Sequence, residues 1–465
     1  MPFHGPYTHY DLRDLSWFTD ANRGLLSRDG ARFALELAQF SYDFAASPWL
    51  SAGWTDISIQ VDNHLLSGVR STGEERDWRQ HILNLLVPRL ARGLTVISNP
   101  VSEVRNTLRM QADHETGKAV TMMLPEKVGT CSIAIGFMGT GRRPQDWAGN
   151  MRFSHPERLH AGFEAIARQY EQNAENIHFP VAARMLGLEK LTLADALEAC
   201  KKPGSPFRFI LAGHSQGAAV MQVWTCRRLA EGILKEYIAG FGYASPMAAI
   251  SMSDDERRCP LTHFLFSDDI FTRMGLREHL GRCYLLPADD MVRARCYGDE
   301  MRNPLFLAVL DLLNRQRDIA QALTLCMGYL EALSHRPYKV IASSLSAFFE
   351  SALMDLPAIA EEWINRLMRF TRRSFRRYYY DAVGQEMPDG DLEAIRIQMD
   401  ELMEEYGAVH LSRMLVRSLY LTHSLTSPDP DGIKPAPYLY LVNHAFSDIL
   451  PLNDPGYAVS TPGSS

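Results

Sequence analysis

The amino-acid sequence predicts an α/β fold, in which helices flank a mainly parallel central sheet. Short apolar runs alternate with segments whose apolar residues recur at helical spacing. Such alternation is typical of parallel strands joined by crossover helices, which cover both faces of the sheet. The pattern changes near residue 302, after which nearly everything up to residue 424 has helical spacing. A large helical insertion or cap is therefore predicted in addition to the sheet.

The length of 465 residues predicts two or three domains, or one large domain with an insertion. We expect residues 1–301 to form the α/β core, together with an N-terminal helical and hairpin segment. Residues 302–424 are expected to form the helical insertion or cap. Residues 425–465 are expected to return to the core, because an apolar run reappears there at 438–442. This run predicts a last strand or extended segment.

The individual elements are predicted from the spacing of apolar residues. Before the parallel sheet, a helix is expected at 31–46 and a hairpin around 105–124, with its turn at 114–117. In the core, buried strands are predicted at 132–137, 207–212, 237–241 and 263–266. Helices are predicted at 160–172 and 218–229.

The composition is that of an ordinary globular protein, with 46% hydrophobic and 22% charged residues. A chain of this kind is able to bury a sizeable core. The formal net charge of −7 is too small to indicate a particular partner. A nucleic-acid partner is not expected, because the chain has no domain-wide excess of basic residues.

The seven cysteines argue against a disulfide framework and a structural zinc site, since no pair has CxxC spacing and the count is odd. A reducing compartment is the simpler explanation. No signal peptide is predicted, because no basic segment followed by an apolar run begins the chain. No apolar run of about 18 residues predicts a membrane span. A cytoplasmic location is expected, and export by a signal-free route is left open.

The motif GHSQG at 213–217 lies between the predicted strand 207–212 and the predicted helix 218–229. A serine in this context is typical of a nucleophile elbow, the sharp strand-to-helix turn of the α/β-hydrolase fold. The serine backbone is strained there, and glycines flank it because larger side chains would collide. The helix N-terminus supplies backbone N–H groups for an oxyanion. Ser215 is therefore predicted to be the nucleophile; the alternative is a chance match in a loop.

Two further segments follow predicted strands and carry residues that acyl transfer requires. The sequence FMGT begins at the last residue of the strand 132–137 and contains a glycine turn. Thr140 and a backbone N–H are therefore placed for an oxyanion hole. The alternative is a plain β-turn with a capping threonine. Asp268 and Asp269 follow the strand 263–266, where a carboxylate would orient a histidine in the chain order Ser, Asp, His. The alternative is a surface turn.

Five segments resemble, in the same order, motifs of the class 3 lipases. The segment 137–147 (FMGTGRRPQDW) resembles their FRGTxSxxDW, and 159–163 (LHAGF) is similar to their HxGF. The other three are 192–197 (TLADAL), which resembles the helix before the elbow, 241–246 (FGYASP), similar to FGSP, and 269–274 (DIFTRM), similar to DIVPRLP. Together they lie within about 129–286, roughly a third of the chain.

The resemblance implies an α/β-hydrolase fold and cleavage of carboxylic esters, among them acylglycerols or other lipids. It also implies that Thr140 and the backbone amide of Gln216 form the oxyanion hole, and that Asp269 rather than its neighbour is the triad acid. The chain departs from the family pattern at Gln216, Ala218 and Met138, where the family has Leu, Gly and Arg. Activity is still expected, because position 216 contributes through its backbone.

Three histidines are candidates for the third member of the triad. His444 is preferred, because it follows the strand-like run 438–442 near the C-terminus, where a histidine loop belongs if the helical region is an insertion. His335 is a rival, since it starts the sequence HRPY, which resembles the family's HxxY. His423 is the third candidate. His214, beside the nucleophile in the chain, is expected to be a packing residue that points away from the site.

The predicted reaction is hydrolysis of a carboxylic ester, in particular a lipid ester of the acylglycerol type. The histidine takes the proton of Ser215, which attacks the carbonyl, while Asp269 orients the histidine. No metal or organic cofactor is expected. The alternatives are hydrolysis of thioesters, phospholipids or small soluble esters, and a non-catalytic relative that binds a partner through the helical region.

One segment of the predicted helical region has a basic face, formed by Arg369, Arg373, Arg376 and Arg377. Apolar residues occupy the opposite face, and a helix of this kind binds an anionic lipid surface in some proteins. A solvated face over a core-facing stripe is the commoner explanation. Peripheral contact with a lipid surface therefore stays an alternative, and the oligomeric state is left open.

Overall fold

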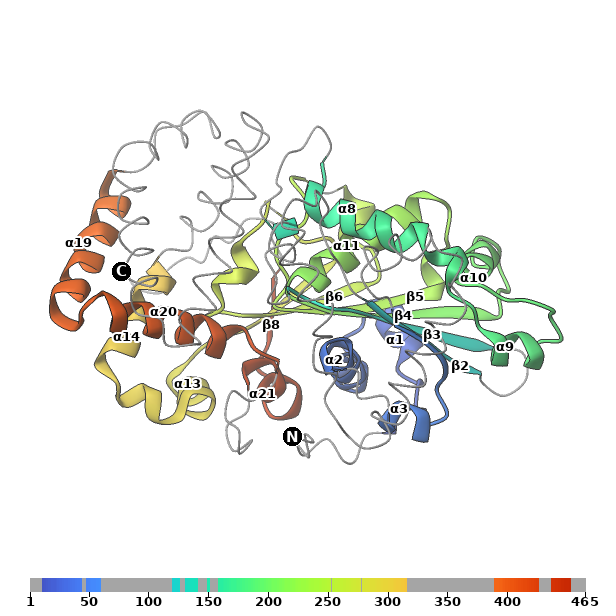
Figure 1. Ribbon diagram of the computed structural model, residues 1–465, viewed down its shortest axis with the longest axis horizontal. Helices are drawn as coiled ribbons and strands as arrows, with labels where there is room; N and C mark the ends of the chain where they lie inside the picture. Colours follow the sequence, from blue (N-terminus) through green and yellow to red (C-terminus); the bar gives the residue numbers. More distant parts are fainter. Residues whose placement is uncertain are drawn as a thin grey trace, which may run out of the picture.

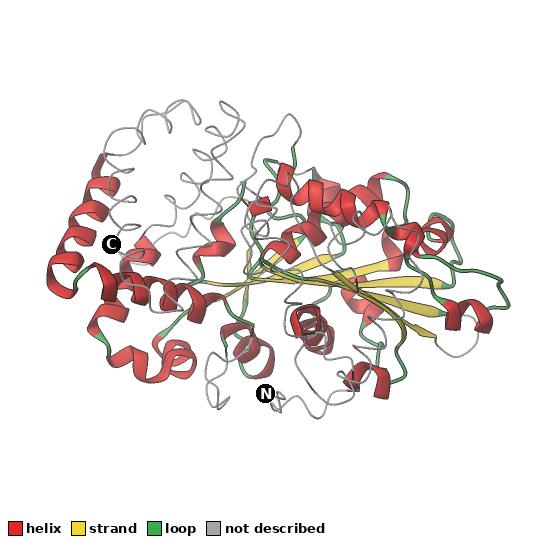
Figure 2. Ribbon diagram, viewed as in Figure 1, coloured by secondary structure: helices red, strands yellow, loops and turns green. Residues whose placement is uncertain are grey.

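The structure, a computed structural model, describes most of the α/β core and part of the C-terminal helices. The described residues are 11–43, 47–59, 119–125, 130–140, 149–150, 158–251, 253–276, 278–315, 389–425 and 436–452. Within them, helices cover both faces of an eight-stranded sheet (Figures 1 and 2). The predicted α/β class, with helices flanking a mainly parallel sheet, is therefore confirmed.

The strands lie side by side in the order in which they occur along the chain. β3 to β7 run parallel to one another, whereas β1, β2 and β8 pair antiparallel with their neighbours. Their bounds are β1 Thr55–Ile59, β2 Ala119–Pro125, β3 Cys131–Phe137, β4 Phe207–His214, β5 Ile238–Tyr243, β6 Leu261–Phe266, β7 Arg282–Leu286 and β8 Leu450–Leu452. The four core strands predicted from apolar runs correspond to β3, β4, β5 and β6.

Helices lie on either side of this sheet (Figure 1). One face carries α8 (Ala161–Gln172), α9 (Pro180–Met185), α10 (Leu193–Ala199) and α11 (Gln216–Ala230). The other carries α1 (Phe18–Asn22), α2 (Arg28–Asp43), α3 (Ser47–Ser51) and α21 (Pro437–Asn443). The shorter elements are α12 (Asp254–Arg257), α13 (Asp290–Tyr297), η1 (Ala174–Asn176), η2 (Lys235–Tyr237), η3 (Ile270–Arg273) and η4 (Gly298–Arg302). The predicted helices at 31–46, 160–172 and 218–229 correspond to α2, α8 and α11.

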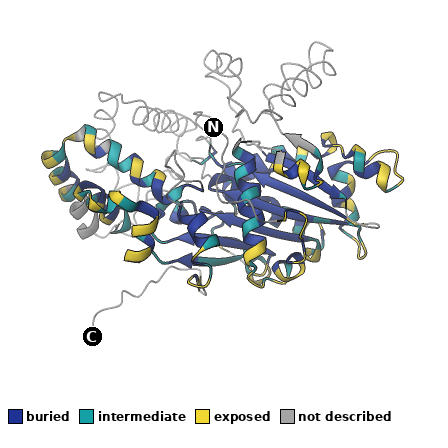
Figure 3. Ribbon diagram, turned by 90° about the horizontal axis from the view of Figure 1, so that it is seen from below, coloured by how far each residue is buried: buried dark blue, intermediate teal, exposed yellow. Residues whose placement is uncertain are grey.

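Each face of the sheet has its own apolar core. Along β3, Ile133 and Ile135 belong to the core under α8 and α11, and Ala134 belongs to the core under α2. Successive side chains of a strand point to opposite faces, so a strand covered on both sides is apolar throughout. Figure 3 shows the buried residues following the sheet and the exposed ones gathered on the outer helices. This double burial explains why short continuous apolar runs marked the strands in the sequence.

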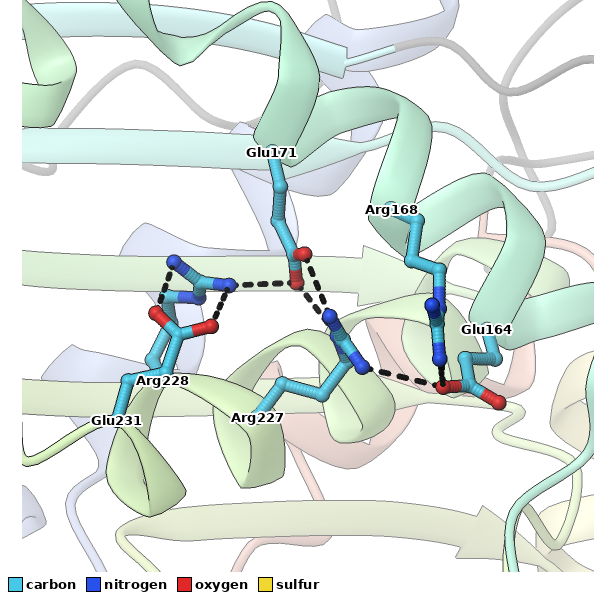
Figure 4. Close-up of polar contacts among 6 residues, drawn as sticks. All are labelled: Glu164, Arg168, Glu171, Arg227, Arg228 and Glu231. Atoms are coloured by element: carbon cyan, nitrogen blue, oxygen red, sulfur yellow. Dashed lines mark hydrogen bonds and ion pairs between the residues drawn. The ribbon is translucent and has the colours of Figure 1, made fainter. Parts of the chain in front are cut away.

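A network of six charged residues holds α11 against α8 (Figure 4). Arg227 on α11 bonds Glu171 at 2.8 Å and Glu164 at 3.1 Å, both on α8. Its neighbour Arg228 also pairs with Glu171, at 2.8 Å. The side chains of these pairs are largely sheltered, so salt screens them less than it would on an open surface. The network fixes the helix that begins directly after Ser215.

Three further helices pack together beyond the end of the sheet, at the left of Figure 1. They are α14 (Pro304–Arg315), α19 (Asp389–Tyr406) and α20 (Ala408–His423). Their shared apolar core contains Leu305, Val309, Leu312, Met399, Leu402 and Leu411. The described parts of 302–424 are thus helical, as predicted. The end of α20 packs against η3, which follows the strand β6.

The apolar run 438–442 is a helix, so the predicted last strand is wrong at this position. α21 begins with Pro437 in its first turn, and each residue from Tyr438 to Val442 is buried. A short run that is apolar throughout lacks the periodicity that separates a strand from a buried helix. The chain nevertheless returns to the core here, and the strand β8 follows the helix and pairs with β7.

Some predictions concern residues outside the described ranges. These are the hairpin turn at 114–117, the basic helix around Arg369, and His335. The strand β2 corresponds to one arm of the expected hairpin, and it pairs antiparallel with β3. Among the described helices, none combines the length and apolar character needed to cross a membrane. The six cysteines in the described ranges are free thiols.

Two buried histidines, His263 and His279, are hydrogen-bonded to backbone carbonyl oxygens. His263 donates from Nε2 to the carbonyl oxygen of Leu280 at 2.9 Å, and His279 donates to that of Ser245 at 2.7 Å. Burial is the main cause that lowers the pKa of His263 to about 3 and the pKa of His279 to about 4. Neither ring is therefore expected to charge above pH 5 while the protein stays folded.

We expect the free energy of unfolding to fall as the pH is lowered from 6.5 to 5. His214, His263 and His279 have folded-state pKa values below the unfolded value, so their contribution is complete above about pH 6.5 and is lost as the pH falls. Glu36 acts oppositely, because burial raises its pKa to about 7. The net uptake of about two protons on unfolding corresponds to about 3 kcal/mol per pH unit.

Urea unfolding at a series of pH values measures this slope. His263→Gln is a suitable control, because glutamine keeps an N–H donor for the Leu280 carbonyl but cannot take up a proton. The slope of that variant should correspond to about one proton fewer than wild type. A wild-type stability that does not change between pH 6.5 and 5 would contradict the expectation.

Candidate active site

Ser215 stands at a strained turn between β4 and α11. β4 ends at His214 and α11 begins at Gln216, which leaves Ser215 with φ 54° and ψ −129°. A positive φ is unfavourable for a residue with a side chain and persists only where the surroundings enforce it. Here the backbone N–H of Ser215 donates to the carbonyl oxygen of Tyr243 on β5 at 2.9 Å. The carbonyl oxygen of Ser215 accepts from the first turn of the helix, at 3.0 Å from the N–H of Ala218.

Two glycines allow the segment after β3 to pass directly over this turn. A Cβ atom on Gly217 would overlap the carbonyl oxygen of Phe137 and lie 2.7 Å from the carbonyl carbon of Met138. A Cβ atom on Gly139 would lie 2.6 Å from the carbonyl oxygen of His214 and 3.2 Å from the Cβ of Ser215. The contacted atoms are mostly backbone, which cannot rotate away. The glycines of both motifs are therefore needed for one close approach.

The carboxylate of Asp269 is fully buried and accepts hydrogen bonds from three groups. Asp269 follows β6 and caps η3, and its Oδ1 accepts the backbone N–H of Phe271 at 3.0 Å. The hydroxyl of Tyr438, on α21, donates to Oδ2 at 2.6 Å. The ring of His423 bonds both carboxylate oxygens through Nδ1, at 2.9 and 3.1 Å. These donors compensate for the loss of water around the buried charge.

The hydrogen bonds of His423 define which ring nitrogen carries the proton. A carboxylate accepts only, so Nδ1 is the protonated nitrogen and Nε2 is the basic one in the neutral ring. The ring lies beside the elbow, with its centroid 4.8 Å from that of His214 and 4.4 Å from that of Phe271. The side chain of His423 is 16% exposed and Ser215 is 9% exposed. Within the described residues, no group hydrogen-bonds the Ser215 hydroxyl.

His423, and not the preferred His444, is therefore the histidine that meets Asp269, and the prediction is corrected on this point. His444 follows the last residue of α21, is exposed, and stacks near Tyr440 with a centroid distance of 5.4 Å. The physical reason is that 438–442 forms a helix rather than a strand, so Tyr438 at its start reaches Asp269 and His444 at its end does not. His335 lies outside the described residues.

The two aspartates predicted after β6 have different surroundings. Asp268 turns to the helices beyond the sheet, where Arg293 on α13 donates to both of its oxygens at 2.9 and 2.7 Å. Tyr297 and Asn314 donate to the same carboxylate at 3.0 and 2.8 Å. Asp268 thus joins α13 and α14 to the end of β6. Of the two, Asp269 is the one that bonds His423, which is the acid that the resemblance to class 3 lipases implies.

The residues predicted to form an oxyanion hole border the elbow. Gln216 is the first residue of α11 and is 2% exposed, so its backbone N–H belongs to the helix N-terminus. Thr140 is next to Gly139, which lies against Ser215. The side chain of Asn150 donates to the Thr140 hydroxyl oxygen at 2.7 Å. Because the Thr140 hydroxyl accepts this bond, its single hydrogen is left to donate to another acceptor.

Three residues of this arrangement were not found from the sequence. Tyr438 lies against the acid, Asn150 against Thr140, and Tyr42 against His214. Tyr438 was recognised only as part of an apolar run, and Asn150 follows the DW of a motif without being part of it. Tyr42 belongs to an ordinary amphipathic helix pattern, in which nothing distinguishes it from the other apolar and aromatic positions. None of them carries a local signal, since each contact depends on distant segments.

No protein-family model matches this chain, and the search of curated proteins finds no match either.

We expect Tyr438→Phe to lower the free energy of unfolding by about 2 kcal/mol, because the change removes a donor from a fully buried carboxylate. Tyr440→Phe is the matched control on the same helix. The Tyr440 hydroxyl makes no hydrogen bond to a described residue, so its loss should cost well under about 1 kcal/mol. Urea unfolding of both variants measures the difference. Equal costs for the two substitutions would contradict the role assigned to the Tyr438 hydroxyl.

Proposed function

We propose that this chain is a serine hydrolase of the α/β-hydrolase type, with Ser215, His423 and Asp269 as its catalytic triad. The observation that carries the proposal is the Asp269–His423 pair standing beside a strained serine between a parallel strand and a helix. Ser215 and Asp269 follow the carboxyl ends of strands, His423 is the last residue of a helix, and their chain order is Ser, Asp, His. Strain at a buried serine is costly, and function is the usual reason for its retention.

The proposed reaction is acyl transfer to water. Nε2 of His423 takes the proton of the Ser215 hydroxyl, whose oxygen attacks the ester carbonyl carbon. The tetrahedral intermediate expels the alcohol, which leaves with the proton now carried by His423. Water then attacks the acyl-enzyme, again giving a proton to His423, and the acid is released as Ser215 regains its proton. Asp269 keeps Nδ1 protonated and stabilises the charged ring.

Oxyanion stabilisation is assigned to Thr140 and the backbone N–H of Gln216. The amide at the start of α11 carries the positive end of the helix dipole, which favours a developing negative charge. Asn150 supports the second donor, because it occupies the oxygen of Thr140 and leaves the hydroxyl proton for another acceptor. The Ser215–His423 hydrogen bond is expected to form with substrate, since such bonds are often long in ligand-free hydrolases.

For the substrate, we propose a carboxylic ester, in particular a lipid ester of the acylglycerol type. The support is the ordered set of segments that resemble class 3 lipases; among them, 241–246 accepts the backbone hydrogen bond of Ser215, and 269–274 begins with the acid. Thioesters, phospholipids and small soluble esters are the alternatives within the same mechanism. The pairing of His423 with Asp269 supports an enzyme over a non-catalytic binding protein, in which no histidine would need to meet the acid.

We expect Ser215→Ala and His423→Ala each to lower kcat/KM for p-nitrophenyl butyrate by about 10³-fold or more, because either change removes a participant in proton transfer. His444→Ala is the matched control, since this exposed histidine does not contact Asp269. It should stay within about twofold of wild type. Circular dichroism of each variant checks that the fold persists. Loss of activity in His444→Ala with full activity in His423→Ala would reject the triad as assigned.

The chain-length dependence tests the substrate class separately. A lipid esterase should prefer p-nitrophenyl palmitate in micelles over the butyrate ester, because each buried methylene contributes about 0.8 kcal/mol of apolar transfer energy. A matched series of butyryl and palmitoyl thioesters measures the competing class. Preference for butyrate, or faster turnover of thioesters, would replace the lipid-ester proposal while leaving the triad intact.

A further inference from the structure

We propose that His214 is a positioning residue, which holds the main chain of His423 at the place where its ring serves Ser215. This inference rests on the proposed function. The inference goes beyond the proposed function because it assigns a role to a residue that a hydrolase triad does not include. The segments that His214 joins are far apart in the chain, since 172 residues separate it from Tyr42 and 209 residues separate it from His423.

Both ring nitrogens of His214 are engaged. The ring lies 2.8 Å through Nε2 from the backbone carbonyl oxygen of His423, and 2.7 Å through Nδ1 from the hydroxyl of Tyr42. His214 is 7% exposed. The residue before the nucleophile therefore does not point away into unrelated packing. It connects the end of α2 with the end of α20.

The direction of each hydrogen bond follows from chemistry. A carbonyl oxygen only accepts, so Nε2 of His214 must carry the proton and donate it to His423. In the neutral ring Nδ1 is then an acceptor, and the Tyr42 hydroxyl donates to it. Burial first, and the nearby His423 second, lower the pKa of His214 well below its usual value, so the ring stays neutral. The tautomer, and with it the polarity of the link, is thereby fixed.

The acceptor is a group that the helix itself leaves without a partner. His423 is the last residue of α20, and the last four carbonyls of a helix have no intrahelical donor. Helix ends fray unless their terminal groups are bound. Because the frayed residue here is the triad histidine, fraying would move the ring away from Ser215. The His214 N–H satisfies this terminal carbonyl.

Two residues, located at or just after the ends of two strands, thus hold His423. Its ring is bound by Asp269, at the end of β6, and its carbonyl is bound by His214, at the end of β4. The nucleophile is the next residue after His214, so this hydrogen bond joins the base to the residue adjacent to the nucleophile. The hydroxyl of Tyr42 bonds His214 at its other ring nitrogen. The same hydroxyl fills the space that a side chain at Gly139 would need.

The experiment compares His214→Leu, His214→Gln and Tyr42→Phe with wild type. Glutamine places an N–H near the position of Nε2 and can restore the bond to His423, whereas leucine cannot. His263→Leu is the matched control for loss of a buried neutral histidine that donates to a backbone carbonyl. Tyr170→Phe is the control for loss of a buried tyrosine hydroxyl bond, here to Thr121. Thermal unfolding is recorded for all five variants.

The readouts are the rate constant and the final stoichiometry of labelling by a fluorophosphonate, together with kcat and KM for p-nitrophenyl butyrate. Positioning predicts full stoichiometry at a labelling rate about 100-fold lower in His214→Leu and about tenfold lower in Tyr42→Phe. It also predicts a lowered kcat at nearly constant KM, and His214→Gln within about tenfold of wild type. The two controls should label at the wild-type rate.

A purely structural role would give a different pattern. His214→Leu would then show fewer reactive molecules at an unchanged rate constant, with no rescue by glutamine, and this result overturns the inference. A wild-type labelling rate in His214→Leu overturns it as well, while labelling of the wild type preserves the proposed function. A wild-type protein that neither labels nor hydrolyses the ester overturns the proposed function and this inference together.

Discussion

The buried carboxylate of Asp269 is the constraint on which the candidate site depends. A carboxylate removed from water is costly unless donors surround it, and here the donors come from Phe271, Tyr438 and His423. They belong to η3, α21 and α20, so satisfying one charge requires two C-terminal helices to dock at the end of β6. The geometry of His423 is therefore a consequence of that requirement as much as of its own helix. The second acid, Asp268, draws α13 and α14 to the same strand end and supports the helix against which α20 packs.

The parts of the site that could be predicted from the sequence are those whose signals are local. The strand β4, Ser215 and α11 form one continuous segment, so an apolar run, two glycines and a helical pattern sufficed to place the strained serine. The pair Asp268 and Asp269 was recognisable for the same reason, since it lies just after a buried strand, whereas the choice of Asp269 came from the resemblance to class 3 lipases. The central sheet was predictable because strands covered on both faces are apolar throughout, and no long-range information is needed to recognise such runs.

The rest could not be predicted because it depends on contacts between distant segments. The His423–Asp269 bond spans 154 residues and the Tyr438–Asp269 bond spans 169. Preference for His444 followed from taking 438–442 as a strand, and nothing in five consecutive buried residues distinguishes a strand from a helix. Because the segment is a helix, Tyr438 near its start contacts Asp269, whereas His444 after its end does not. His214 shows the same limit, because its neighbours in space are the ends of α2 and α20.

The order of these segments along the chain has a consequence for biosynthesis. Synthesis proceeds from the N-terminus, and folded units form as their residues become available. β4, Ser215 and α11 are complete long before His423 is made, since 209 residues separate it from His214. On the proposed mechanism, a nascent chain would carry a formed but inert serine, and reactivity would appear only after α21 brings Tyr438 to the acid. On the same mechanism, cleavage of the finished chain between α11 and α20 would separate the nucleophile from the base, so the reactivity of Ser215 would report on the integrity of the chain between those two helices.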